Sequence, residues 1–242
     1  MSTILITGAS SGIGRCTAEH FLQLGWQVGL IARRTEALDD IASRFDTATA
    51  LPADVSDPQA VTDAVQAFAA QHGRLDVLFN NAGTFGKQAE IDEISDEDWR
   101  FVVDVNLNGM FYAARAAYAQ MKRQHPKGGR IINNGSLSAH SPREMSACYT
   151  TTKHAITGLT KTLSLDGRAH NIACGQIDIG NARTDLVLGL EKTRAAEGLP
   201  PLPAMDVQNV AEAVYSMAGL PLEANVQFMT IMATKMPYVG RG

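Results

Sequence analysis

The chain has 242 residues, 45% of them hydrophobic, and its 21 basic and 25 acidic side chains leave a net charge of −4. This length and apolar content suit one α/β domain with a sizeable core, and the small, mixed charge argues against nucleic-acid binding and disorder. No apolar run is long enough to span a membrane, and the sequence "MSTILITGAS" lacks the features of a signal peptide. We therefore expect a cytoplasmic protein without nucleic-acid or membrane partners.

The cysteines and histidines indicate neither disulfide bonds nor a metal site. Cys16, Cys148 and Cys174 are odd in number, far apart and not in CxxC pairs, and the six histidines have no ligand spacing. We expect free thiols and no bound metal.

Short apolar runs alternate with helical patterns along most of the chain. The runs predict strands at residues 3–7, 27–32, 48–55, 75–83, 129–136 and 172–180, with a strand-like run near the C-terminus. Helices are predicted at residues 14–25, 35–45, 58–73, 99–124 and 149–170. Because the strands are almost wholly apolar, the pattern predicts a Rossmann-like, doubly wound α/β sheet of about seven mainly parallel strands with helices on both faces. No linker divides the chain, so we expect a single domain over residues 1–242.

Residues 183–206 interrupt this alternation. They combine an amphipathic piece with the corner "LPPLP", which cannot remain helical. Long irregular insertions in compact domains are often functional, so this segment is predicted to be a substrate flap.

The segment "TGASSGIG" (residues 7–14) lies where the first strand passes into the first helix. Gly8 suits a tight turn, Gly12 allows close backbone approach to a ligand, and Gly14 allows the helix to pack closely on the strand. The helix N-terminus then offers free N–H groups and a positive dipole to a phosphate. The loop predicts dinucleotide binding, although an ordinary glycine-rich turn is the alternative.

The end of the second strand indicates which dinucleotide is bound. NAD-binding folds place an acidic residue about 20 residues beyond the glycine loop to hold the ribose hydroxyls. This chain has Arg33 and Arg34 there, with no carboxylate before Glu36. A guanidinium pairs with an added phosphate, so NADP(H) is favoured over NAD(H), and a solvated basic turn is the alternative.

Five motifs in order carry a family resemblance: "TGASSGIG", "NNAG" at residues 80–83, "VNLNG" around Asn106, then Ser136, and finally the YxxxK pair Tyr149 and Lys153. Over residues 4–184 the chain resembles the short-chain dehydrogenase/reductase family. The resemblance implies a nicotinamide-dependent oxidoreductase with Asn106, Ser136, Tyr149 and Lys153 as catalytic residues.

The residue types and spacing of the tyrosine and lysine also indicate acid and base chemistry without the resemblance. They are four residues apart and so share one helix face. An ammonium about 4 Å from the phenol contributes on the order of 4 kcal/mol at an effective dielectric of 20, enough to lower its pKa by up to about 3 units. Desolvation of the phenolate opposes this, so the figure is an upper limit. We expect Tyr149 to act as the acid and base.

The resemblance implies the remaining roles. Ser136 would hold the substrate oxygen, Lys153 the nicotinamide ribose, Asn106 a water that relays protons, Asp54 the adenine and Thr184 the carboxamide. The family's spacing selects Ser136 over Ser138 and Asn106 over Asn108. The expected cofactor contacts are Gly8, Ser10, Ser11, Gly12, Ile13, Gly14, Arg33, Arg34, Asp54, Val55, Asn81, Ala82, Gly83, Tyr149, Lys153, Ile179, Gly180 and Thr184.

The sequence departs from the family pattern at "QIDIGNART". Ile179 occupies the usual proline position, which restores a backbone N–H and frees one torsion angle, so the loop beneath the nicotinamide could take another course. Asp178 either faces the pocket, where it would repel anionic substrates, or caps the turn.

We therefore predict an NADP(H)-dependent oxidoreductase that interconverts a carbonyl and a secondary alcohol. The alternatives are a non-catalytic NADP(H) sensor on the same fold and a family enzyme that uses NAD(H) or performs another reduction. The expected substrate is a medium-sized, partly apolar ketone or aldehyde, with pocket walls at Leu137, residues 141–147 and the flap; Arg143 and Glu144 point either inward or into solvent. The resemblance implies a homotetramer, with a homodimer as the alternative.

Overall fold

The computed structural model describes residues 2–196 and 198–239, which form one seven-stranded sheet with the strand order β3-β2-β1-β4-β5-β6-β7. Every paired strand is parallel to its neighbour. The strands are β1 (Thr3–Thr7), β2 (Gln27–Ala32), β3 (Ala48–Pro52), β4 (Val77–Asn80), β5 (Gly129–Asn134), β6 (Ile172–Ile179) and β7 (Phe228–Ile231). The predicted fold class is therefore confirmed.

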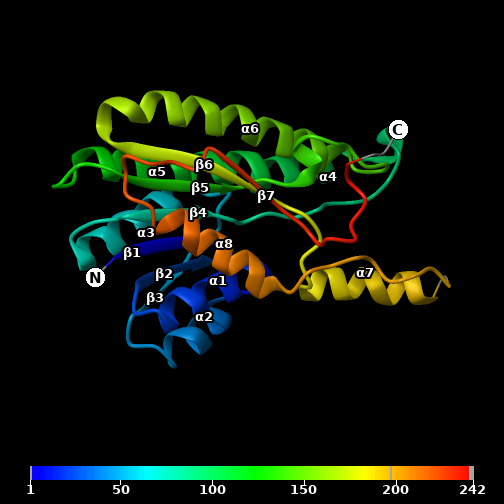
Figure 1. The fold of residues 1–242 in the computed structure, drawn as a ribbon, viewed down its shortest axis with the longest axis horizontal. Coiled ribbons are helices and arrows are strands. Elements are labelled where there is room, and N and C mark those ends of the chain that lie inside the picture. Colours follow the sequence, from blue (N-terminus) through cyan, green and yellow to red (C-terminus); the bar gives the residue numbers. More distant parts are fainter. Residues whose placement is uncertain (1, 197, 240–242) are drawn as a thin grey trace.

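Helices cover both faces of the sheet, as Figure 1 shows. They are α1 (Gly12–Gln23), α2 (Thr35–Ala42), α3 (Pro58–His72), α4 (Asp96–Val103), α5 (Gly109–Arg123), α6 (Ala147–Gly167), α7 (Asp185–Ala196) and α8 (Val207–Ala218). The first, second and eighth helices lie on one face, and the third, fifth and sixth on the other. Within the described part of the chain, no helix is both long and apolar enough to cross a membrane.

Local sequence explains the helix ends, as α3 illustrates. The Asp57 carboxylate accepts the N–H groups of Gln59 and Ala60, while Pro58 occupies the first turn, where no N–H partner is needed. Gly73 ends the helix at φ +79°, a left-handed conformation that favours glycine.

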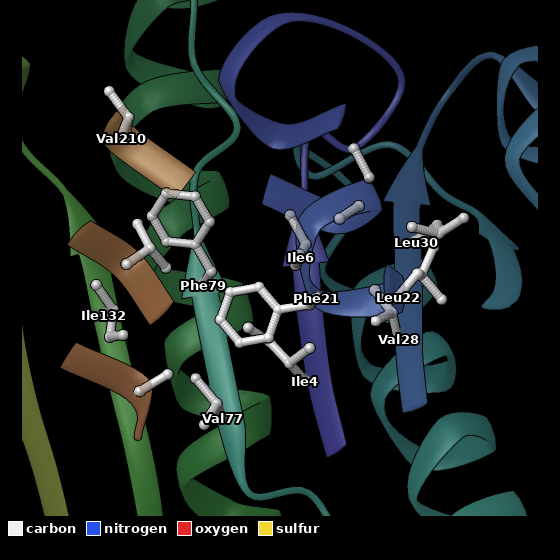
Figure 2. Packing of buried hydrophobic residues seen from close by; sticks show 14 of the residues in the cluster. Ile4, Ile6, Phe21, Leu22, Val28, Leu30, Val77, Phe79, Ile132 and Val210 are labelled. Atoms are coloured by element: carbon white, nitrogen blue, oxygen red, sulfur yellow. The ribbon is translucent and has the colours of Figure 1, made fainter. Parts of the chain in front are cut away.

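The core is divided between the two faces of the central strands. On the α1 face, the ring of Phe21 lies over β1 and β4, between Ile4 and Phe79 (Figure 2). All three side chains are fully buried. Each such side chain contributes about 1.5–3 kcal/mol relative to an exposed one, so this layer stabilises the packing of α1 on the central strands.

The strand order reverses between β1 and β4, which opens a crevice at their carboxyl ends. Thr7 joins the two strands there, because its hydroxyl accepts hydrogen bonds from the backbone N–H groups of Asn81 and Ala82, both at 2.9 Å. The glycine loop after β1 and the NNAG segment after β4 thus form one rigid floor.

The long helical region predicted over residues 99–124 is present, but it contains a turn of another kind. The structure has α4, then a π-helical turn at Asp104–Asn108, then α5. The apolar periodicity continues through the turn, so the sequence pattern does not reveal it. Such turns are frequent at functional sites, and this one contains Asn106.

Residues 183–206 are less irregular than their composition suggests. They contain α7, which extends away from the sheet (Figure 1), and an extended return segment. The two ends of the segment are joined because Arg183 N–H donates to the Met205 carbonyl and Met205 N–H donates to the Asn181 carbonyl. The segment is therefore a helical insertion whose two ends are joined by backbone hydrogen bonds.

Candidate active site

The crevice between β1 and β4 encloses a cavity of about 570 Å³, and a second cavity of about 180 Å³ adjoins it. Tyr149 and Thr184 border both. Of the expected cofactor contacts, all line the larger cavity except Gly14, which lies behind the loop, and Ile179 and Gly180, which line the smaller one. The structure thus brings these distant residues together at one edge of the sheet.

The glycine loop forms a cradle that a side chain would fill. At Gly14, an added Cβ would lie 2.3 Å from the Gly8 carbonyl oxygen. At Gly8, whose φ is +69°, it would lie 2.9 Å from the Ala82 Cα. The loop can therefore pack against the NNAG segment only with glycine at these positions, which leaves the space above it open for a ligand.

The N-terminus of α1 points its unpaired N–H groups toward this space. Ser11 is the N-cap residue, but its side chain does not cap the helix, and the first turn carries no acidic residue. The positive end of the helix dipole is therefore not neutralised by the chain itself and suits an anion such as a phosphate group. These features fit a dinucleotide.

Two arginines border the far end of the larger cavity. Arg34 donates to the hydroxyl of Ser10 at 3.1 Å, so it braces the glycine loop. Arg33 is 66% exposed and approaches Asp54 only to 3.9 Å. Partial burial opposes ionisation of Asp54, but hydrogen bonds from Ser56 and the charge of Arg33 hold its pKa below the ordinary value. Arg33 therefore has donors available for a further anion.

Lys153 is buried beside Tyr149. Its ammonium donates to the Asn134 carbonyl at 2.7 Å and lies 5.5 Å from the centroid of the Tyr149 ring. Burial lowers the pKa of Lys153 to about 8, although the charge of Asp178 acts in the opposite direction. Asn134 was not anticipated from the sequence, and its backbone carbonyl gives no sequence signal.

The pKa of Tyr149 corrects the sequence-based expectation. Burial raises it, the hydrogen bond with Ser136 and the charge of Arg143 lower it, and Asp178 raises it further, for a net increase. The expected lowering by Lys153 is wrong for this structure, because desolvation of the phenolate outweighs the nearby positive charges. The phenol is therefore held protonated and ready to donate.

Ser136 and Ser138 lie together at the end of β5, and both line the smaller cavity. The Ser136 hydroxyl accepts the N–H of Ser138 at 3.1 Å, and its interaction with Tyr149 lowers the pKa of that phenol. Ser136 thus borders the same cavity as Tyr149, and its role in holding the substrate oxygen stays a prediction.

Asn106 is completely buried and lines neither cavity. Its amide oxygen accepts the N–H of Thr84 at 2.7 Å, and its amide nitrogen donates to the Thr84 carbonyl at 2.8 Å and the Thr152 hydroxyl at 3.3 Å. The side chain thus joins the segment after β4 to α6, directly ahead of Lys153. A proton-relay water at Asn106 stays a prediction.

Asp178 does not line either cavity, so its carboxylate does not face a ligand there directly. Its buried carboxylate accepts the N–H of Ser136 at 3.0 Å and the side-chain amide of Gln176 at 2.7 Å, and it pairs with His140 at 2.7 Å. It therefore anchors the strand end that carries Ser136, a more extensive role than capping a turn. Its one sequence signal was a charge within an apolar strand.

We expect Asp178→Ala to lower the free energy of unfolding by about 2–4 kcal/mol, because two buried N–H donors lose their acceptor at about 1–3 kcal/mol each. Asp178→Asn, which keeps one acceptor oxygen, should cost less. Urea denaturation of the cofactor-free protein at pH 7 measures both, with the exposed Asp166→Ala as the control. A loss below about 0.5 kcal/mol for Asp178→Ala, the size of an ordinary surface change, would contradict this role.

The smaller cavity contains residues that the sequence did not indicate. Leu137, Pro142 and Arg143 line it as expected, but so do Phe85 and the tail residues Met236, Pro237 and Tyr238. Glu144 does not line it. The tail gives no local signal of this position, because only the return of the chain from β7 brings it there.

Ile179, at the usual proline position, continues the strand. It is the last residue of β6 and pairs with Ile231 of β7, and the following N–H, of Gly180, donates to the Ile231 carbonyl at 2.8 Å. The strand pairing therefore runs to the edge of the smaller cavity, whose floor Ile179 and Gly180 form.

Comparisons with known proteins identify the family. The family model described as "short chain dehydrogenase" matches residues 2–195. A 3beta-hydroxysteroid dehydrogenase of Mediterraneibacter gnavus is 33% identical over 80% of this chain and 72% of its own. A cyclohexanol dehydrogenase of an Acinetobacter species is 34% identical over 78% of this chain and 76% of its own.

Solved structures show the same fold. The closed form of a serine dehydrogenase complexed with NADP+ has a TM-score of 0.90 at 26% identity and covers 99% of this chain and 98% of its own. A 3-ketoacyl-(acyl-carrier-protein) reductase from Brucella melitensis, complexed with NADH, has a TM-score of 0.87 at 25% identity, with 98% of each chain covered.

The family model spans the glycine loop, the NNAG segment and the Tyr149–Lys153 pair, and the relatives are oxidoreductases that act on CH–OH groups with NAD(P). The family resemblance drawn from the motifs is thereby confirmed. This chain belongs to the short-chain dehydrogenase family and is an NAD(P)-dependent oxidoreductase acting on hydroxyl or carbonyl groups.

Proposed function

We propose that the chain interconverts a carbonyl group and a secondary alcohol with NADP(H), using Tyr149 as the acid and base. The supporting observation is that Tyr149 borders both cavities. A dinucleotide in the larger cavity and a small substrate in the smaller one would both reach the same phenol. The glycine cradle, the α1 N-terminus and Arg33 fit the charged parts of such a cofactor.

Residues of the chain would then transfer the proton. The cofactor, when bound, supplies or accepts the hydride. In reduction, Tyr149 donates its O–H proton to the carbonyl oxygen, and Ser136 hydrogen-bonds the same oxygen. The buried ammonium of Lys153, 5.5 Å from the ring centroid, stabilises the phenolate that results. By resemblance, Lys153 would also hold the nicotinamide ribose and Thr184 would contact the carboxamide.

The test of this activity is oxidation of NADPH by the purified protein with a panel of ketones, aldehydes and quinones. The proposal expects turnover with at least one carbonyl compound and formation of the matching alcohol. NADPH binding without turnover on the whole panel would favour the alternative function, a nucleotide sensor on the same fold.

NADP(H) is proposed over NAD(H) on the basis of Arg33. We expect Arg33→Ala to raise the Kd for NADPH by about 10-fold or more while leaving that for NADH nearly unchanged, because one charge-assisted contact to the extra phosphate is lost. Titration of the protein with each cofactor, followed by fluorescence, measures the ratio.

Arg100→Ala is the matched control, because the Arg100 side chain is equally exposed at 66% but pairs with Asp96 and borders neither cavity. An unchanged NADPH/NADH affinity ratio in Arg33→Ala would show that Arg33 does not select the cofactor.

The remaining proposals concern the whole molecule. We propose that residues 1–242 act as one domain and that residues 183–206 cover the substrate, since Thr184 and Val187 of this segment line the smaller cavity.

We also propose a homotetramer or homodimer. Two exposed aromatic rings support it, Phe111 on α5 at 44% exposure and Phe228 on β7 at 38%. The free thiols of the three cysteines support a cytoplasmic location.

A further inference from the structure

The smaller cavity carries one charge. Among its lining residues within the described part of the chain, only Arg143 has a charged side chain, and the others are apolar or neutral polar groups. This cation lines the same small cavity as Ser136 and Tyr149, so one side chain of the cavity can attract an anionic group.

The guanidinium of Arg143 is held over the reacting group by two aromatic rings. Its central carbon lies 5.6 Å from the centroid of the Phe85 ring and 5.9 Å from that of the Tyr149 ring. The two rings meet edge to face at 4.8 Å. Stacking of this kind orients the planar guanidinium while leaving its N–H donors free.

No carboxylate of the described residues neutralises Arg143. Arg15, Arg44, Arg74 and Arg100 each form a salt bridge, whereas Arg143 has none within residues 2–196 and 198–239. The nearby buried carboxylate, Asp178, is already engaged by His140, Gln176 and the Ser136 backbone. The donors of Arg143 are therefore available to a ligand.

We propose that Arg143 binds a carboxylate of the substrate, so that the enzyme acts on short oxo acids and the corresponding hydroxy acids. This rests on the proposed carbonyl–alcohol activity and narrows its substrate class. The carbonyl oxygen would lie at Tyr149 and Ser136 and the carboxylate at Arg143, whose forked donors match its two oxygens. In reduction, the carbonyl carbon gains a hydride from NADPH, its oxygen gains the Tyr149 proton, and the carboxylate is unchanged.

The dimensions favour a short molecule. The guanidinium carbon lies 5.9 Å from the centroid of the Tyr149 ring, so a ligand that reaches both residues needs only a few bonds between its carboxylate and its carbonyl group. The cavity, at about 180 Å³, is below the 300–1,000 Å³ of pockets that hold drug-sized ligands. Leu137, Ile179 and Val187 would contact the short hydrocarbon part. The inferred substrate is thus smaller and more polar than the one expected from the sequence.

The experiment compares 2-oxopentanoate, 3-oxopentanoate and 4-oxopentanoate with their methyl esters as substrates for NADPH oxidation. We expect at least one acid to exceed its ester in kcat/KM by about 10- to 100-fold, the size of a hydrogen-bonded charge pair. Arg143→Met should bring this acid-to-ester ratio close to one, and Arg143→Lys should keep part of the preference. The ratio cancels any effect of the Arg143 charge on Tyr149 that is common to both substrates.

Arg115→Met is the matched control. The Arg115 guanidinium lies over two aromatic rings, those of Phe111 and Tyr112, both at 5.5 Å, but it borders neither cavity. This variant should keep the wild-type acid-to-ester ratio.

Several outcomes would overturn the inference. They are esters reduced as well as acids, a preference for acids that survives Arg143→Met, and turnover of dihydroxyacetone phosphate or cyclohexanone with none of the oxo acids. In each, carbonyl reduction is intact and only the carboxylate assignment fails. Absence of turnover with every carbonyl compound would instead mean that the proposed function itself is wrong.

Discussion

Replacement of Tyr149 by phenylalanine is expected to lower kcat for carbonyl reduction by about 10²–10⁴-fold, the range typical of a lost general acid. The change removes one hydroxyl and keeps the ring, which packs against Phe85 at 4.8 Å and lies under Arg143. The walls of both cavities therefore stay in place, and the Kd for NADPH should change little.

Steady-state NADPH oxidation measures kcat for Tyr149→Phe, and cofactor fluorescence titration measures the Kd. Tyr215→Phe is the control, because Tyr215 lies on α8 and borders neither cavity. Turnover by Tyr149→Phe within a few-fold of wild type would show that another group supplies the proton.

Lys153→Met is expected to have opposite effects on activity and stability. It should abolish most activity, because the phenolate loses its buried counter-charge. It should also raise the free energy of unfolding of the cofactor-free protein at pH 7. The pKa of Lys153 falls from 10.5 to about 8 on folding. Keeping the lysine protonated in the folded state therefore costs about 3 kcal/mol, at about 1.4 kcal/mol per pKa unit.

The lost hydrogen bond from Lys153 to the Asn134 carbonyl offsets about 1 kcal/mol of that gain. The net expectation is a stabilisation of about 2 kcal/mol at pH 7. Enzymes commonly give up stability in this way at their active sites.

The pH dependence of the stability difference shows whether the buried charge of Lys153 causes it. Between about pH 8 and 10.5 the unfolded chain binds more protons at Lys153 than the folded one, so the wild type gains stability as pH rises and the advantage of Lys153→Met shrinks. Cys174, whose pKa burial raises to about 12, acts in the opposite direction above pH 9, but equally in both proteins. The difference between the two proteins thus isolates Lys153.

Guanidinium denaturation at several pH values from 7 to 10 measures this difference. Lys161→Met is the control, because Lys161 lies on the same helix, α6, but is exposed, with its ammonium 5.9 Å from the Phe228 ring centroid. A lower stability of Lys153→Met at pH 7, or a difference that does not shrink with pH, would contradict the burial argument.

Much of the fold and of the larger cavity could be predicted because local backbone needs leave a direct trace in sequence. Apolar runs marked the strands, and the glycines at positions 8 and 14 marked a turn that no side chain can enter. The order of the motifs then indicated which strand ends meet. Even the position of Arg33 and Arg34 at this cavity could be predicted, because they follow a strand at a known distance from the loop.

The electrostatics of Tyr149 could not be predicted in the same way. The spacing of Tyr149 and Lys153 correctly places them on one helix face, but the direction of the tyrosine's pKa shift depends on how deeply both groups are buried. Burial is a property of everything packed around the helix, including Asp178, which lies 29 positions beyond the tyrosine in the chain.

By itself, then, the sequence determined the α/β fold, the family and the residues gathered at the edge of the sheet, because periodicity, glycine positions and motif spacing are local properties. Only the tertiary structure decided that Asn106 braces Thr84, that Asp178 anchors Ser136, and that Arg143 reaches the smaller cavity without a salt bridge to any described residue. These roles depend on partners brought together by folding and on the water that their packing excludes, and neither is encoded in any short stretch of the chain.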